Sequence, residues 1–337
     1  MLRVALAGAG MISRHHLIAW SRRADARVTA ICDPDRDRAA GRAAEFDIPA
    51  VHDSLEALLA AEPVDAVDVA SPRETHAALV RLAAARGLPV LCQKPLTPTL
   101  AEGVALVGEV AGHSRLMVHE NWRVRPWYRQ VGAWLADGTL GEPRSCRLSM
   151  LCSGLLPDAT GRRPALERQP FMAAEERMLI AEALIHHLDV VRWLTGPLRV
   201  VAARAARACE GVRGESLATI LLETAAGLPV IVEGNMASAG FSPRTQDRLT
   251  LIGSRASALL EDAELRLLGP APQTRSWDVA EAYQESFDAT IGHFVDSLAQ
   301  GTPFETDGAD NLETLRLVEH AYWAAGLQRP AVVEAAR

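Results

Sequence analysis

The first 120 residues alternate short apolar runs with longer segments whose apolar positions recur every three or four residues. Short, nearly continuous apolar runs are typical of parallel strands covered by helices on both faces, and the longer spacing predicts amphipathic helices. This alternation predicts an α/β domain with a doubly wound parallel sheet, which binds its ligand outside the carboxyl ends of the strands. The expected strands are Leu2–Ala7, Val28–Cys32, Ala66–Ala70, Val90–Cys92 and Leu116–Val118, and the expected helices are Arg36–Phe46, Ser54–Ala61, Thr75–Arg86 and Leu100–Ala111.

The order of the expected elements changes after residue 120, where helices no longer alternate regularly with strands. Strands segregated from helices predict an α+β domain with an open, largely antiparallel sheet, so the expected domains are residues 1–120 and 121–337. Leu155–Gln169 has the composition of a loop. The expected strands are Ser145–Leu151, Arg199–Ala205, Ala218–Glu223, Pro229–Glu233, Arg248–Ile252 and Ala258–Glu261, and the expected helices are Leu179–Leu194, Tyr283–Ala299 and Leu312–Ala325.

The composition fits two globular domains that act on a small molecule. The chain has 337 residues and a formal charge of −7, without a polybasic block, which argues against nucleic acid or an anionic membrane as the main partner. Its five cysteines form no C-x-x-C pair, which argues against a disulfide framework and suggests a reducing compartment. No apolar run reaches the roughly 18 residues of a membrane span, and the first residues show no signal-peptide pattern. We therefore expect a cytoplasmic protein.

A glycine-rich turn, Gly8-Ala9-Gly10-Met11-Ile12-Ser13, follows the first expected strand. Gly8 permits a tight turn, and Gly10 lets the backbone approach a pyrophosphate that the next helix binds with its unpaired N–H groups. Asp33 follows the second strand, about 20 residues further on, where a carboxylate binds a ribose 2′-hydroxyl and repels a 2′-phosphate. This combination predicts a Rossmann domain that binds NAD in preference to NADP. A purely structural turn is the alternative, and the nearby Arg36 leaves NADP open.

A lysine follows the fourth expected strand, Val90–Cys92. The run Pro89–Cys92 leads directly into Gln93-Lys94-Pro95, so Lys94 reaches the carboxyl edge of the sheet, where a nicotinamide would lie. Its ammonium group could bind a substrate oxygen and stabilise an alkoxide as hydride leaves carbon. The alternative is an ordinary surface lysine in a strand-to-helix loop.

Glu182, His186 and Asp189 are spaced so that they share one face of a helix. The carboxylate of Glu182 can orient the imidazole of His186, which can then accept a proton from a substrate hydroxyl. A hydrogen-bonded histidine in the core is one alternative. A metal site from His186, His187 and Asp189 is disfavoured because adjacent histidines diverge on a helix, so we expect no metal.

Other residues near the expected crevice are open to two interpretations. Ser71 and His76 follow the third strand, where a nicotinamide ring could rest, although His76 could equally be an ordinary residue of the next helix. Trp122 and Arg123 follow the last strand of the first domain and suit a sugar ring with its hydroxyls, with interdomain packing as the alternative for Trp122. His15 and His16 receive no catalytic role.

These motifs resemble the Gfo/Idh/MocA family of nicotinamide-dependent oxidoreductases over nearly the whole chain. The resemblance rests on the glycine turn, on Gln93-Lys94-Pro95, where the family usually shows Glu-Lys-Pro, and on Glu182 four residues before His186, at a position more often Asp. The segment from Tyr283 to Phe294, Asp310-Asn311 and Tyr322 also look like the family's C-terminal helices. The resemblance implies that Lys94 is the active-site lysine and His186 the acid–base residue. It also implies a sugar or cyclitol substrate and a homodimer or homotetramer assembled through the C-terminal sheet.

A finer resemblance concerns the substrate. His119-Glu120-Asn121-Trp122, Pro126-Trp127-Tyr128 and Arg168-Gln169-Pro170-Phe171 look like the branch of the family that contains D-apiose dehydrogenases. We thus expect an NAD-dependent dehydrogenase of a sugar or polyol, with an NAD-retaining glycoside-cleaving enzyme and a non-catalytic NAD- or sugar-binding sensor as alternatives. The candidate catalytic residues are Lys94, His186 and Glu182; the candidate cofactor contacts are Gly8, Gly10, Met11, Ile12, Asp33, Ser71, His76, Gln93 and Lys94; and the candidate substrate contacts are Trp122, Arg123 and Asp189.

Overall fold

The computed structural model of the chain describes residues 1–327. These residues form two compact units. The first consists of Met1–Val124 and Tyr283–Leu315, and the second of Arg125–Ala282 and the residues from Arg316 onward. The division therefore places a late segment with the first unit, whereas the sequence pattern assigns all of 121–337 to one domain. Residues 328–337 of that expected domain lie outside the described residues.

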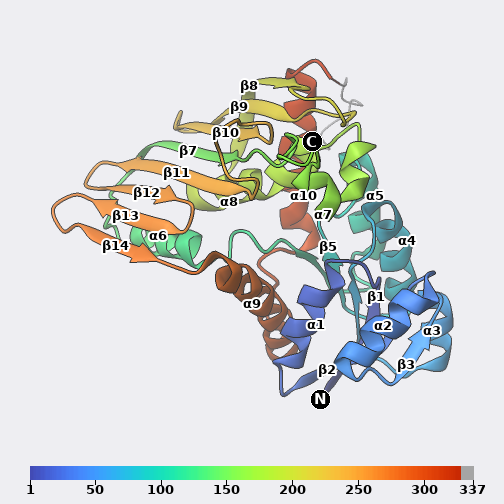
Figure 1. Cartoon of the computed structure of the whole chain (residues 1–337). Helices are drawn as coiled ribbons and strands as arrows, with labels where there is room; N and C mark the ends of the chain where they lie inside the picture. The colour runs from blue at the N-terminus through green and yellow to red at the C-terminus, as the bar shows by residue number, and fades with distance from the viewer. Residues whose placement is uncertain (328–337) are drawn as a thin grey trace. The chain divides into compact units, whose positions relative to one another are not determined.

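The first unit contains a fully parallel six-stranded sheet (blue to cyan in Figure 1). Its order β3-β2-β1-β4-β5-β6 is that of a dinucleotide-binding Rossmann fold, which confirms the predicted fold class. The short β3 was not predicted, because its three residues are only half-buried and form no apolar run. The strands are β1 (Leu2–Ala7), β2 (Ala26–Cys32), β3 (Ala50–His52), β4 (Ala66–Val69), β5 (Val90–Gln93) and β6 (Leu116–His119).

Helices connect these strands, and side chains fix where several of the helices begin. Asp35, Ser54 and Thr99 each accept a hydrogen bond from a backbone N–H of the first turn of α2, α3 and α5. Such N-caps satisfy amide groups that the helix itself leaves unpaired. The connecting helices are α1 (Ser13–Ser21), α2 (Arg36–Phe46), α3 (Leu55–Ala61), α4 (Arg73–Ala84) and α5 (Leu100–Val110). Most of α9 (Val279–Gln300) and the start of α10 (Gly308–Ala324) also belong to this unit.

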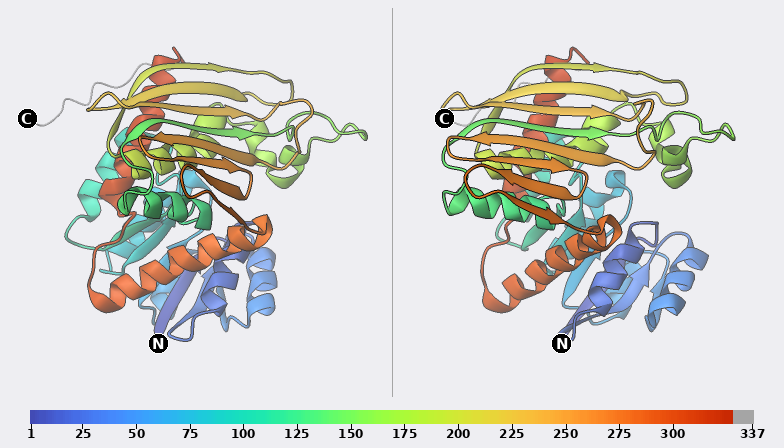
Figure 2. Two further views of the ribbon diagram at one scale, coloured as in Figure 1. Left: turned by 90° about the vertical axis from the view of Figure 1, so that its left-hand side faces the viewer. Right: turned by 60° about the vertical axis from the view of Figure 1, so that its left-hand side comes forward.

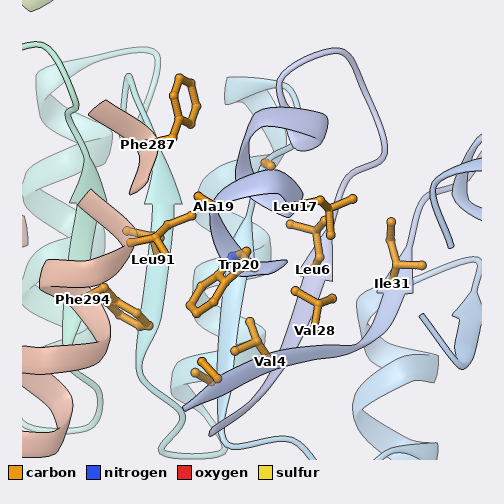
Figure 3. Close-up of a cluster of buried hydrophobic side chains, with 14 of the residues drawn as sticks. Val4, Leu6, Leu17, Ala19, Trp20, Val28, Ile31, Leu91, Phe287 and Phe294 are labelled. Carbon is orange, nitrogen blue, oxygen red and sulfur yellow. The ribbon is translucent and has the colours of Figure 1, made fainter. Parts of the chain in front are cut away.

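Helix α9 completes the core of the first unit. Its Phe287 and Phe294 are buried in the same apolar cluster as Trp20 of α1 and Leu91 of β5 (Figure 3). The ring of Trp20 meets that of Phe294 edge-on, with centroids 6.4 Å apart. Burying aromatic side chains removes a large apolar area from water, and this explains why a segment so late in the chain belongs to the first unit.

The second unit contains an eight-stranded sheet in the order β14-β13-β12-β11-β7-β10-β9-β8 (Figure 2). Only β7 and β10 are parallel neighbours, so the prediction of a largely antiparallel sheet is confirmed. Buried and more exposed residues alternate along β9, β10 and β11, so the sheet buries one face. The strands are β7 (Pro143–Leu151), β8 (Leu198–Ala206), β9 (Leu217–Thr224), β10 (Pro229–Asn235), β11 (Gln246–Gly253), β12 (Ser257–Glu261), β13 (Glu264–Leu268) and β14 (Gln273–Ser276).

Helical segments cover the buried face of this sheet. A Cβ at Gly234 of β10 would lie 2.8 Å from the side chain of Leu184, and one at Gly132 of α6 would strike the ring of Trp193 of α8, so these elements pack closely. The expected loop Leu155–Gln169 contains a short helix, and α6, β13 and β14 were not predicted. The helical segments are α6 (Pro126–Ala136), α7 (Pro164–Arg168), the 3₁₀ turn η1 (Pro170–Ala173), the π-helix η2 (Leu179–Leu184) and α8 (Ile185–Thr195). Within the described part of the chain, none of the helices combines the length and apolar character needed to cross a membrane.

A buried carboxylate links three elements of the second unit. Asp247 of β11 accepts hydrogen bonds from the hydroxyl of Tyr128 at 2.8 Å and from Nε2 of His187 at 2.9 Å, and the guanidinium of Arg125 lies 3.8 Å away. Burial by itself would raise the pKa of Asp247, but the attraction of His187 and Arg125 and the hydrogen bonds it accepts hold that pKa below its usual value. The ionised carboxylate therefore stabilises this unit.

We expect Asp247→Asn to destabilise the protein by about 3–5 kcal/mol at neutral pH, because it removes the buried negative charge that His187 and Arg125 face. Since the pKa of Asp247 is lower in the folded than in the unfolded chain, its stabilisation is complete above about pH 4 and is lost as pH falls. Urea unfolding at several pH values should show the difference between variant and wild type shrinking toward acid. Asp53→Asn, at an exposed position of the first unit, is the control. A difference between Asp247→Asn and wild type that stays constant across pH would contradict this assignment.

Candidate active site

The glycine turn after β1 has the geometry that the sequence predicts. Gly8 has φ = +109°, and a Cβ there would lie 2.5 Å from the carbonyl oxygen of Ala70 at the end of β4. A side chain is therefore excluded by the fold itself. At Gly10, by contrast, no atom of the described residues lies within 4 Å of the Cβ position, and φ is not in the left-handed region. The protein does not fill this space, which leaves it open to a ligand.

The N-terminus of α1 follows this open position directly and has no side-chain cap. The helix begins at Ser13, and its N-cap, Ile12, has no side chain that could accept from the first N–H groups. The Ser13 hydroxyl donates to the carbonyl oxygen of Gly10 at 2.7 Å and so closes the turn, while Met11 is 45% exposed. An uncapped helix N-terminus beside a glycine with open space above it fits the pyrophosphate of a dinucleotide.

Asp33, directly after β2, fixes the turn from the other side. One carboxylate oxygen accepts the N–H of Ala9 at 2.8 Å and the other accepts the N–H of Asp35 at 2.9 Å. A carboxylate oxygen can accept more than one hydrogen bond, so Asp33 keeps capacity for the hydroxyls of a ribose. The adenosine end of NAD fits this arrangement.

The loop after β4 is tied to the loop after β5 by a buried histidine. One ring nitrogen of His76 lies 2.9 Å from the carbonyl oxygen of Ser71, and the other lies 2.9 Å from that of Pro95. The Ser71 hydroxyl bonds that of Thr75 at 2.7 Å. His76 is therefore a bridge between two loops of the carboxyl edge, and these contacts account for its burial without a ligand.

Lys94 is half-buried and follows β5 directly. Its backbone N–H donates to Oε1 of Gln93 at 2.9 Å. The other side of the Gln93 amide lies 3.0 Å from Nε2 of His16, which in turn bonds Asp68 at 2.8 Å. The sequence reasoning gave His16 no role and did not single out Asp68. The signal was present, since an aspartate inside a predicted central strand needs a buried partner.

Lys94 is also distinguished by composition. Of the 35 lysine and arginine residues in the chain, it is the only lysine. Arginine serves as well as lysine for solubility and surface ion pairs, but its guanidinium is larger, planar and always charged. The compact ammonium group of lysine thus occurs once in this chain, directly after β5 at the carboxyl edge of the sheet.

The two candidate substrate residues after β6 have different surroundings. Arg123 is 2% exposed and donates to Asp310 at 2.8 Å and to the carbonyl oxygen of Glu305, so it holds the start of α10 within the first unit. Trp122 is half-buried, and its ring meets that of Tyr283 edge-on, with centroids 6.3 Å apart. Packing within the unit thus accounts for Arg123 more fully than for Trp122.

The second unit places Glu182 and His186 on a helix of changed geometry. The sequence analysis expected one regular α-helix over Leu179–Leu194, but Leu179–Leu184 is a π-helix and α8 begins at Ile185. The i, i+4 spacing of an α-helix therefore does not describe Glu182 and His186, because a π-helix bonds i to i+5. Such turns often occur at functional sites.

Two further polar residues of α8, His187 and Asp189, are buried. Asp189 is fully buried and lies 3.4 Å from the guanidinium of Arg192. His187 donates from Nε2 to Asp247 at 2.9 Å, which places it in the core of the second unit. Among residues 1–327, no group of three or more histidine, cysteine, aspartate or glutamate side chains is arranged to hold a metal ion.

The carboxyl edge of the first unit thus gathers four loops that the sequence separates widely. Asp33 touches the glycine turn, the turn touches the end of β4, and His76 joins that end to the loop that carries Lys94. Glu182 and His186 belong to the second unit.

Comparison with known proteins identifies the class that this fold and edge define, an oxidoreductase with an NAD-binding Rossmann fold. The model of that oxidoreductase family matches residues 2–120, and the model of the GFO/IDH/MocA C-terminal domain matches residues 128–259. The chain belongs to the Gfo/Idh/MocA family and is an NAD-dependent dehydrogenase.

Individual relatives cover almost the whole chain. It is 34% identical to D-apiose dehydrogenase of Paraburkholderia graminis over 95% of this chain and 87% of the relative. It is 31% identical to inositol 2-dehydrogenase 4 of Saccharopolyspora erythraea over 89% of this chain and 86% of the relative. Among solved structures, an oxidoreductase from Agrobacterium radiobacter in complex with NAD+, L-tartaric acid and magnesium is 32% identical, with a TM-score of 0.90 and 97% of each chain covered.

We expect Asp33→Asn to lower the preference for NAD over NADP about tenfold, which corresponds to ~1.4 kcal/mol, because the variant keeps an acceptor oxygen but loses the charge that repels a 2′-phosphate. Calorimetric titration of both cofactors measures this ratio. Asp35→Asn removes a charge two residues away and still caps α2, so it should leave the ratio unchanged. Equal ratios in the Asp33 variant and wild type would refute the assignment.

Proposed function

We propose that this dehydrogenase oxidises a hydroxyl-bearing carbon of a sugar or polyol and that D-apiose is the first substrate to test. The observation that carries the proposal is the 34% identity to a D-apiose dehydrogenase over nearly the whole length of both chains. Inositol 2-dehydrogenases are also relatives, so a cyclic polyol is the second class to test. Both substrate classes present several hydroxyls on one small ring or chain.

Residues of the expected domain 1–120 would hold the cofactor. The glycine turn with Met11 and Ile12 would bind the pyrophosphate, Asp33 the adenosine ribose, and Ser71, His76 and Gln93 would border the nicotinamide. NAD, when bound, supplies the carbon that accepts the hydride. The expected domain 121–337 would supply the substrate face, with Asp189 on α8 and Trp122 shortly after β6.

Lys94 and His186 would carry the chemistry of the hydroxyl. We assign the Lys94 ammonium to the substrate oxygen, where it stabilises the negative charge that develops as the C–H bond breaks. His186 would accept the hydroxyl proton, and Glu182 would orient its imidazole. The single lysine of the chain supports this role, because a substrate oxygen in a small pocket fits a compact ammonium better than a planar guanidinium.

We expect Lys94→Ala and His186→Ala each to lower kcat by at least about 10², the low end for a positioned acid–base group. Lys94→Arg keeps the charge but should restore little activity, because the guanidinium has a different shape. His113→Ala, exposed at the end of α5, is the control for removal of an imidazole. Stopped-flow absorbance of the reduced nicotinamide measures the step. If both alanine variants turn over as fast as the wild-type protein, the proposed roles of Lys94 and His186 are wrong.

Substrate identity is tested by incubating the protein with NAD and a panel of D-apiose, other pentoses, hexoses, inositols and sugar acids, while following reduced nicotinamide. We expect the highest kcat/KM with D-apiose or an inositol. Cleavage of a glycoside without net reduced cofactor would point to the NAD-retaining alternative, and NAD binding without turnover of any member would point to a sensor.

We propose further that the protein is a cytoplasmic homodimer or homotetramer that uses the outward face of its eight-stranded sheet. Leu221 of β9 and Ile252 of β11 are each 37% exposed and alternate with buried neighbours, so they belong to that face. Sedimentation of the purified protein measures the number of subunits.

A further inference from the structure

A buried carboxylate occupies the middle of the parallel sheet of the first unit. Asp68 lies on β4, all of whose residues are buried, and one of its oxygens accepts hydrogen bonds from Nε1 of Trp20 at 2.7 Å and from His16 at 2.8 Å. Burying a carboxylate is costly unless hydrogen-bonding partners offset the lost hydration. An apolar residue would suit this strand better, so the pairing calls for an explanation beyond folding.

The hydrogen bonds that lead from Asp68 to Lys94 have only one consistent direction. The backbone N–H of Lys94 can only donate, so the atom of Gln93 it meets is the carbonyl oxygen Oε1. The other end of that amide is then the NH₂ group, which donates to Nε2 of His16 at 3.0 Å. His16 must therefore carry its proton on Nδ1, from which it donates to Asp68.

The second hydrogen of the Gln93 amide points toward another imidazole. Nδ1 of His119 on β6 lies 3.4 Å from Nε2 of Gln93, and the rings of His16 and His119 are 4.3 Å apart. Gln93 thus offers two donors to two ring nitrogens. A glutamate at this position would offer none, and Nε2 of His16 would have to gain a proton to face it.

We propose that Asp68, His16 and Gln93 are positioning residues that fix the backbone of Lys94 at the carboxyl end of β5, and that glutamine at position 93 keeps His16 neutral. The inference rests on the proposed function only for the catalytic role of Lys94. The ionisable groups that face His16 are Asp68 from β4 and His119 from β6, while α9 presents the apolar ring of Phe287. With Gln93 in place, every hydrogen bond between Asp68 and the backbone of Lys94 is made with His16 neutral.

A glutamate at position 93 should make the hydrogen bonds between Asp68 and Lys94 depend on pH. Gln93→Glu retains an oxygen for the N–H of Lys94, but its second oxygen needs an imidazolium at His16. That imidazolium is present at low pH and is lost as pH rises, after which two carboxylates face one neutral ring. Gln93→Ala removes the acceptor for Lys94 at every pH.

The first test observes Lys94 directly. Because the chain has one lysine, labelling with ¹⁵N-lysine gives a single backbone amide signal, that of Lys94. We expect slow hydrogen exchange of this amide in wild type, exchange at least about tenfold faster in Gln93→Ala, and slow exchange only at low pH in Gln93→Glu. Gln300→Glu, exposed at the end of α9, makes the same chemical change as a control. Equal exchange in wild type and Gln93→Ala would overturn the proposal.

The second test observes His16. With ¹⁵N-histidine, we expect the ring of His16 at neutral pH to carry its proton on Nδ1 alone, because Nε2 accepts from the Gln93 amide. In Gln93→Glu both ring nitrogens should carry protons when the pH is lowered. Protonation of Nε2 in wild type would overturn the proposal even if every variant folded poorly.

The third test separates positioning from packing. Gln93→Ala should lower kcat by about tenfold to a hundredfold, the effect of a small misplacement, and this loss should exceed any rise in KM for NAD. The kcat of Gln93→Glu relative to wild type should fall as pH rises, and a parallel pH profile would contradict the inference. If the wild-type protein oxidises no sugar, the proposed function is wrong. The two NMR tests still show whether Gln93 fixes the backbone of Lys94 and the protonation of His16.

Discussion

The reversal of strand order between β1 and β4 is the constraint on which the candidate site depends. In a parallel sheet every strand ends at the same edge, and where the connections diverge to opposite sides the loops leave a crevice. Gly8, at this point, has no room for a side chain because the end of β4 lies against it. The same edge receives Asp33 from β2 and Lys94 from β5. Residues up to 86 positions apart are thus held together by backbone pairing, before any side chain contributes.

Two of the buried carboxylates, Asp247 in the second unit and Asp68 in the first, are held by polar partners that lead to different places. Asp247 meets Tyr128, His187 and Arg125, and it joins a strand to two helices in the second unit. Asp68 meets Trp20 and His16, but its hydrogen-bonded chain continues to the backbone of Lys94. The difference indicates a division of roles. Asp247 stabilises the second unit, whereas the hydrogen bonds from Asp68 lead to Lys94 at the carboxyl edge of the first unit.

Local patterns sufficed for the elements that are either continuously apolar or regularly amphipathic. They predicted the central strands, the glycine turn, Asp33 and the position of Lys94 after a buried strand. They did not predict β3, because its three residues are only half-buried. They also did not predict the π-helix before His186, because its wider turn does not change the amino-acid composition of the segment. The contacts of His16 with Asp68 and Gln93 join positions far apart along the chain, so no periodicity could reveal them.

The return of α9 to the first unit has a consequence for biosynthesis. The apolar side of α1, with Trp20, is covered by Phe287 and Phe294, which leave the ribosome only after the whole eight-stranded sheet has been made. The nascent cofactor-binding half must therefore wait with an uncovered hydrophobic surface while the other half is translated. Shortened versions that end near residue 120 would share that exposed surface permanently, so they would tend to aggregate rather than bind nucleotide as isolated modules.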